Sequence, residues 1–88
     1  MLKNKIHPGQ FLREELAERE VSQSALAKHI KVQPNVINQI CNEKRGISPE
    51  MAKKLAAALG TTPELWINLQ GTYDLYRAQD PDFGKLRA

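Results

Sequence analysis

Apolar residues recur every three or four positions along most of this 88-residue chain, which is the spacing of one face of an α-helix. Polar residues, prolines and glycines divide the pattern into five predicted helices, at about 8–19, 22–30, 34–42, 49–59 and 63–79. Ser48–Pro49 and Thr62–Pro63 repeat one start signal: a capping side chain, then a proline whose missing N–H costs nothing at the first helical position. The sequence therefore predicts an all-α fold.

The stretch from Ser22 to Arg45 predicts two short helices joined by a tight turn near residues 31–33. Ser22 is suited to cap the first helix, and Pro34 to open the second. The apolar side of the second helix consists of Val36, Ile37, Ile40 and Cys41. Its outer side carries four amides: Asn35, Asn38, Gln39 and Asn42. In the loop that follows, Gly46 can take a positive φ.

Four amide side chains on one short helix indicate that this face has a function beyond contact with solvent. Asparagine is a poorer helix former than the glutamate and lysine that exposed faces usually carry. An amide offers a donor and an acceptor together, and this pair matches the adenine edge in the major groove of DNA. The alternative is an ordinary solvated helix face. A helix-turn-helix pattern followed by Lys44 and Arg45 favours the DNA interpretation.

The positive charge of the chain is concentrated on the same stretch. The net charge is +3. Between residues 21 and 46 the bases outnumber the single acid Glu43, and the rest of the chain is neutral. The bases are Lys28, Lys31, Lys44 and Arg45. Such a patch favours phosphate backbones by releasing condensed counterions, although charge alone would equally fit a chance cluster on a mildly basic surface.

The helix-turn-helix stretch resembles the lambda-repressor-like (Cro/C1, or XRE) family. Gln23 opens the first helix, and Ala27 stands four positions on, where the two helices of the motif cross. Ile37 and Ile40 match the aliphatic residues that hold the second helix down, and Lys31 replaces the glycine common in the turn. The wider pattern, over roughly residues 6–79, is similar to HigA-type antitoxins of HigB–HigA modules. It consists of IHPGQFLREEL, SQSALA, PNVINQI, KRGIS and ELWINLQ.

Two departures from the family pattern lie in the second helix and just after it. Many relatives have arginine at the position of Val36 and glycine at that of Glu43. The first change bears on which bases are read, and the second on the helix end beside the phosphates.

The resemblance implies a five-helix lambda-repressor-like domain over residues 8–79, with an N-terminal arm at 1–7 and a tail at 80–88. It implies a homodimer that binds a palindromic operator in double-stranded DNA, represses its own operon and neutralises a HigB-type, RelE-like RNase toxin. One alternative is an XRE-type repressor with no toxin partner. Another is an interaction module that has lost DNA binding, although such a module would not need an amide-rich, positively charged helix.

The DNA-contacting residues can be assigned on the predicted helix-turn-helix. We expect base edges to be contacted by Gln33, Asn35, Asn38 and Gln39. We expect phosphates to be held by Gln23, Lys28, Lys44 and Arg45. For Gln23, an amide at a helix N-terminus suits a phosphate, and the alternative is a role in the capping turn.

Two further surfaces are candidates for protein partners. The last helix carries more apolar surface than one small domain needs, and aromatic residues are enriched at interfaces. We therefore expect a dimer interface formed by Trp66, Leu69, Tyr73 and Tyr76, unless these residues complete the core of the monomer. Gly71 leaves open a break in this helix. The acidic residues Glu14, Glu15 and Glu18 are the expected toxin-binding site, and a solvated face is the alternative.

Several classes of function find no support in the sequence. His7, His29 and Cys41 lack the spacing of metal ligands, and His7 is expected to be a packing or turn residue. No nucleophile has a plausible base and no glycine-rich phosphate loop is present, so we expect neither an enzyme nor a cofactor. A single cysteine allows no internal disulfide, which fits a cytoplasmic protein. No apolar run reaches membrane-spanning length, and no secretory segment follows Met1.

Overall fold

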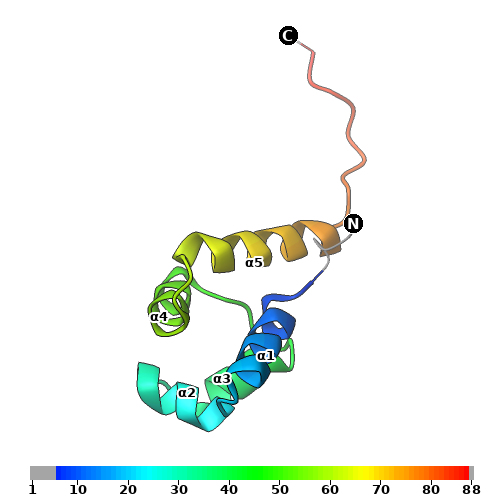
Figure 1. Ribbon diagram of the computed structural model, residues 1–88. Helices are drawn as coiled ribbons and strands as arrows, with labels where there is room; N and C mark the ends of the chain where they lie inside the picture. The colour runs from blue at the N-terminus through cyan, green and yellow to red at the C-terminus, as the bar shows by residue number, and fades with distance from the viewer. Residues whose placement is uncertain (1–5, 88) are drawn as a thin grey trace.

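The computed structural model describes residues 6–87, and within this range it contains five α-helices and no strand (Figure 1). The helices are α1 (Pro8–Arg19), α2 (Gln23–Ile30), α3 (Pro34–Cys41), α4 (Pro49–Leu59) and α5 (Pro63–Arg77). The predicted all-α fold is confirmed. Of the predicted N-terminal arm, only Ile6 and His7 lie within the described residues. None of the helices in residues 6–87 combines the length and apolar character that a membrane span requires.

Three helices begin as the sequence predicts, with a hydroxyl cap. The side chains of Ser22, Ser48 and Thr62 each accept a hydrogen bond from the backbone N–H three residues on. The donors are Ala25 at 3.0 Å, Met51 at 3.1 Å and Leu65 at 3.3 Å. Each bond satisfies one N–H that the first helical turn leaves without a partner, so the local sequence determines where these helices start.

Helix ends in the left-handed conformation are occupied mainly by charged residues. Glu20, Lys31 and Glu43 have φ of 57°, 61° and 61°, and Gly60 has φ of 74°. Gly46 could take a positive φ but does not, because Glu43 provides the left-handed turn after α3. A Cβ at Gly46 would instead lie 2.9 Å from Oε1 of Gln70. Gly46 therefore permits a close approach between the loop and α5.

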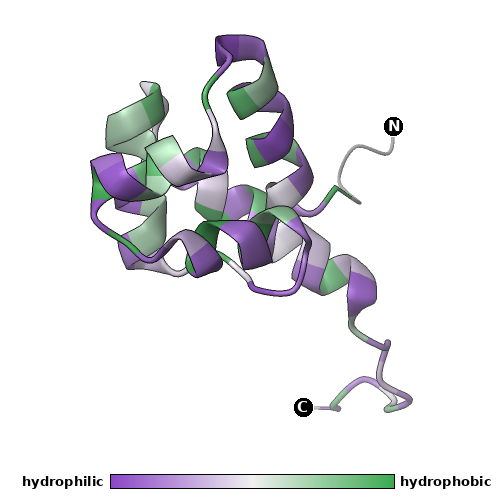
Figure 2. Ribbon diagram, turned by 90° about the horizontal axis from the view of Figure 1, so that it is seen from below, coloured by the Kyte–Doolittle hydropathy of each residue, from purple (hydrophilic) through white to green (hydrophobic). Residues whose placement is uncertain are grey.

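The core is formed by one side of each helix. Its buried members are Leu12, Leu16, Leu26, Ala27, Ile37, Ile40, Cys41, Ile47, Ala52, Leu55, Ala56, Leu59 and Trp66. Figure 2 shows the resulting alternation of apolar and polar segments along the helices. Trp66 is 0% exposed, and its indole N–H donates to Oγ1 of Thr61 at 2.8 Å. The assignment of Trp66 to a dimer interface was therefore wrong, because its side chain completes the core of the monomer.

Helix α1 packs on α3 and α5, α2 packs on α3 and α4, and α4 packs on α5. The first turn of α1 approaches α3 so closely that a Cβ at Gly9 would lie 1.8 Å from the carbonyl oxygen of Ile40. Helix α5 is continuous through Gly71 and ends at Arg77, two residues before the predicted end. Its C-terminal turn and residues 78–87 extend away from the other helices (Figure 1).

Candidate nucleic-acid interface

Helices α2 and α3 pack against each other and are joined by a turn of three residues. Ala27 is fully buried, as expected for the small residue where the two helices cross. Lys31 takes the left-handed conformation that a glycine would take more easily. The N–H of Val32 then donates to the carbonyl of Ala27 at 3.0 Å, which closes the end of α2. The sequence thus forms a compact helix-turn-helix despite the missing glycine.

The outer side of α3 presents the predicted base-contacting residues. Asn35 and Asn38 are exposed, and Gln39 is half-buried. Gln33 is the N-cap residue of α3, but its side chain makes no capping hydrogen bond and is exposed. Its amide is therefore available at the entrance to the helix. Underneath, Ile37 and Ile40 are fully buried and hold α3 against the core.

Hydrogen bonds connect several of these amides. The Nδ2 of Asn38 donates to Oε1 of Gln23 on α2 at 3.3 Å. The Nδ2 of Asn42 donates to Oδ1 of Asn38 at 3.2 Å. Separately, Nε of Arg45 donates to Oε1 of Gln39 at 2.8 Å. The structure thus joins predicted phosphate-contacting residues to predicted base-contacting residues. The contribution of Asn42 was missed, although its spacing of four residues from Asn38 could have indicated it.

The basic residues of the motif are exposed at its outer edges, with Lys28 on α2 and both Lys44 and Arg45 in the loop after α3. The acid of this stretch, Glu43, instead lies 3.7 Å from the guanidinium of Arg13 on α1. Arg13 also donates to the carbonyl of Cys41, at the C-terminal end of α3. No local sequence pattern predicts this contact, because it joins residues 28 positions apart.

The other predicted contact residues occupy different parts of the surface. On α1, Glu14 and Glu18 are exposed, whereas Glu15 is half-buried and its Oε1 lies 3.0 Å from Nη2 of Arg19. The same Arg19 nitrogen donates to the carbonyl of Leu59 at 2.8 Å, which ties α1 to the end of α4. Of the predicted dimer residues on α5, Leu69 and Tyr73 are half-buried and Tyr76 is exposed.

His7 links the start of α1 to α5. It is buried, and its Nδ1 accepts a hydrogen bond from the N–H of Gly9 at 2.8 Å. Its ring meets the edge of Tyr73 at 4.8 Å between centroids, and the guanidinium of Arg77 lies 5.7 Å from the centre of the Tyr73 ring. Burial lowers the pKa of His7 below 6.5, and the nearby Glu43 opposes this shift. His7 is therefore a helix cap and packing residue, as expected.

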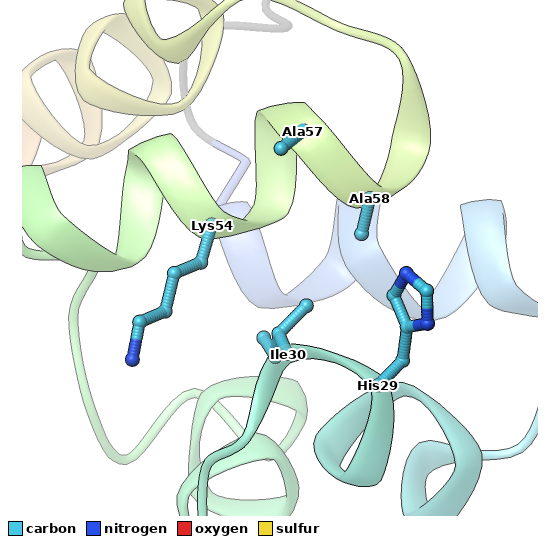
Figure 3. A pocket seen from close by; sticks show the side chains of 5 residues that line it. All are labelled: His29, Ile30, Lys54, Ala57 and Ala58. Carbon is cyan, nitrogen blue, oxygen red and sulfur yellow. The ribbon is translucent and has the colours of Figure 1, made fainter.

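The buried thiol of Cys41 is a core group, and burial raises its pKa. Among residues 6–87 no group of three potential metal ligands comes together. A surface hollow of about 240 Å³ lies between α2 and α4 and is shown in Figure 3. Ala58 of α4 points toward His29 of α2 across it, and Ile30, Lys54 and Ala57 complete the lining. None of the predicted DNA-contacting residues lines this hollow.

Comparisons with known proteins agree with this geometry. A helix-turn-helix family model matches residues 12–66. Virulence-associated protein I of Dichelobacter nodosus is 44% identical over 75 residues, which cover 84% of this chain and 69% of that protein. The Pseudomonas aeruginosa antitoxin HigA, solved with the higBA promoter, is 44% identical with a TM-score of 0.79, over 82% of this chain and 79% of that one. A HigA-family addiction module antidote protein from Coxiella burnetii is 44% identical with a TM-score of 0.77, over 81% and 78%.

Proposed function

Since the chain belongs to the helix-turn-helix family of DNA-binding regulators, with HigA antitoxins as its structural neighbours, we propose that it is a HigA-type antitoxin. In this proposal it binds a palindromic operator at its own promoter as a homodimer, represses its own operon, and neutralises a HigB-type RNase toxin. The observation that carries the proposal is the amide-bearing outer side of α3, supported by buried isoleucines and flanked by exposed cations.

In the proposed DNA complex, different residues of this surface contact the bases and the phosphates. Helix α3 would enter the major groove, where Gln33, Asn35, Asn38 and Gln39 would face base edges. Gln23 at the start of α2, together with Lys28, Lys44 and Arg45, would hold the phosphates on either side. The Arg13–Glu43 pair supports this arrangement, because it directs the one acid of the stretch toward α1.

A salt titration on the promoter duplex of the operon and on a random duplex tests the proposal. Asn38→Ala should weaken binding to the promoter by about 1–3 kcal/mol and hardly alter binding to random DNA. Lys44→Ala should weaken both alike and lower the slope against log salt by about one unit. Lys85→Ala, an exposed lysine on the tail, serves as the control. If the wild type showed no preference for the promoter, operator binding would be refuted.

The homodimer is proposed through the outer half of α5. Leu75 is 79% exposed and Tyr76 is 58% exposed, and both belong to the last turn of α5. This end of the helix points away from α4 (Figure 1). Leu69 and Tyr73 would continue this surface inward. A two-fold dimer would set its recognition helices about 34 Å apart, one turn of DNA, against a palindrome.

Sedimentation equilibrium tests this interface with Leu75→Asp. The variant should remain folded, because the side chain lies outside the core, and should shift from dimer to monomer. Glu64→Asp, an exposed and conservative change at the start of the same helix, should leave the association unchanged. A wild type that is monomeric at high micromolar concentration would exclude the dimer.

Toxin binding is proposed at Glu14, Glu15 and Glu18 on α1. A toxin that grips RNA must be basic, so an acidic surface matches it and would speed the encounter. Glu14 and Glu18 are the better candidates, because Glu15 already pairs with Arg19. Residues 78–87 of the tail are an alternative docking site, because neither the DNA surface nor the dimer surface uses them.

Co-expression with the small reading frame adjacent to this gene provides the test. Glu14→Lys combined with Glu18→Lys should restore toxicity while operator binding persists. Glu64→Lys combined with Glu50→Lys makes the same change in charge on exposed positions of α5 and α4 and should leave the toxin silenced. Continued protection by the α1 variant would exclude this docking site. If the neighbouring product were harmless when expressed alone, the chain would be an XRE-type repressor without a toxin.

A further inference from the structure

The amide of Asn38 is held from both sides within the candidate interface. Its Nδ2 donates to Gln23 on α2, and its Oδ1 accepts from Asn42 one turn further along α3. A primary amide has two N–H donors and two acceptor lone pairs. The two bonds use one of each, and Asn38 is exposed. One donor and one acceptor therefore remain to meet a ligand.

We propose that Gln23 and Asn42 fix the orientation of the Asn38 amide, so that Asn38 reads adenine at one position of each operator half-site. This inference rests on the proposed operator binding. Adenine presents N7 as an acceptor and N6 as a donor in the major groove, which complements the remaining pair on Asn38. Guanine presents two acceptors there, cytosine a donor, and thymine an acceptor beside its methyl group.

The orientation matters because χ2, the torsion angle that rotates an asparagine amide, has a broad distribution with roughly two-fold symmetry. Without partners, the donor and the acceptor of Asn38 could exchange places at little cost, and only one of the two orientations matches adenine. The acceptor on Gln23 and the donor on Asn42 both favour the same orientation. Asn42 is thus a positioning residue, which acts on the base through Asn38. Gln23 gains this role in addition to its proposed contact with phosphate.

The experiment begins with selection of wild-type binding sites from a randomised duplex pool. The wild type should enrich adenine at one position per half-site. Affinities are then measured for the consensus duplex and for a duplex with guanine at that position. Asn38→Ala should bring the ratio of the two affinities close to one. Asn42→Ala should lower the ratio about three- to tenfold, the value expected for one lost hydrogen bond, and should have no further effect on the ratio in the Asn38→Ala background.

Gln23 supplies a matched pair of variants. Gln23→Glu keeps an acceptor for Asn38 and should preserve the ratio, even where the added charge weakens binding to every duplex. Gln23→Leu removes the acceptor and should lower the ratio as Asn42→Ala does. Circular dichroism checks that each variant is helical, and a ratio is interpreted only between folded variants of equal helicity.

Two results would overturn the positioning role while leaving operator binding intact. One is a ratio unaffected by both Asn42→Ala and Gln23→Leu. The other is an Asn38→Ala variant that keeps the wild-type base preference at every position of the selected site. A wild type that enriches no sequence at all would instead refute the proposed operator binding on which the inference rests.

Discussion

Helix α3 and the outer half of α5 expose surfaces of opposite chemical character, the first polar and the second apolar. The outer side of α3 is polar, and several of its side chains are hydrogen-bonded to neighbours above fully buried isoleucines. The outer half of α5 is apolar at Leu75 and Tyr76 and extends beyond the domain. A polar surface of hydrogen-bonded amides suits recognition of a patterned ligand, whereas an extended apolar surface suits burial against another protein. The two surfaces therefore call for partners of different chemistry.

The largest expected effect separates the two halves of α5. Trp66→Ala should lower the free energy of unfolding by about 3–5 kcal/mol, because it opens a cavity in the core and removes the packing on Phe11, whose ring centroid lies 5.3 Å away. Leu75→Ala, nine residues further on, should change stability by less than about 0.5 kcal/mol. Urea denaturation at a protein concentration that dissociates any dimer provides the comparison. Equal losses would mean that the outer half of α5 is not a separate surface.

Replacing glycine by alanine should lower stability at Gly9, where α1 meets α3, and raise it at Gly71 on α5. Gly9→Ala places a Cβ against the carbonyl of Ile40, and forcing α1 away from α3 should cost about 1–3 kcal/mol of stability. Gly71→Ala meets no atom within 4 Å on α5 and should gain about 0.5–1 kcal/mol, because alanine is the better helix former. Thermal unfolding of both variants measures the contrast. A gain from both would show that α1 can move away from α3 without loss.

The contact between the start of α1 and Tyr73 of α5 should respond to pH through His7. Burial lowers the pKa of His7 in the folded chain below its ordinary value of 6.5, so the unfolded chain takes up the proton first. The free energy of unfolding should therefore decrease as pH falls below about 6.5 toward the lower folded pKa. Protonation also removes the Nδ1 lone pair that caps Gly9.

A pair of histidine variants isolates this effect. His7→Asn keeps a side-chain acceptor at the N-cap and should flatten the dependence of stability on pH in that range. His29→Asn changes an exposed side chain and should leave the wild-type dependence in place. Denaturant titrations between pH 7 and 5 measure all three proteins. An unchanged slope in His7→Asn would assign the acid sensitivity to other groups.

Much of the fold could be predicted, because its signals are local. Ser22, Ser48 and Thr62 are caps that act within three residues, so the starts of their helices follow from the sequence. The role of Trp66 could not be predicted in this way. An apolar stripe on a helix has the same pattern whether its own chain or a second chain covers it. Here Trp66 of α5 is buried in the core, whereas Leu75 and Tyr76 on the same helix are exposed.

The candidate interface was predictable in its composition but less so in its connections. Amides and cations could be assigned to α3 and its flanks from their spacing. The bond between Gln23 and Asn38 depends on how α2 crosses α3, and the Arg13–Cys41 contact depends on how α1 crosses α3. Such contacts follow from tertiary packing, which no local pattern encodes. The left-handed turn at Glu43 was missed because of a local signal: Gly46, three residues later, is the residue type that adopts a positive φ most easily.

The charged residues at the left-handed helix ends bear on how this protein could adapt to heat. A non-glycine residue there carries roughly 1 kcal/mol of backbone strain, so Glu20 and Lys31 each mark a place where one substitution could raise the melting temperature without touching the core. At Glu20 the change to glycine would leave the helix-turn-helix unaltered. At Lys31 it would also remove a cation from the positively charged stretch. In a hot environment, Glu20→Gly would raise stability without affecting DNA binding. Lys31→Gly would raise stability but lower the affinity for DNA.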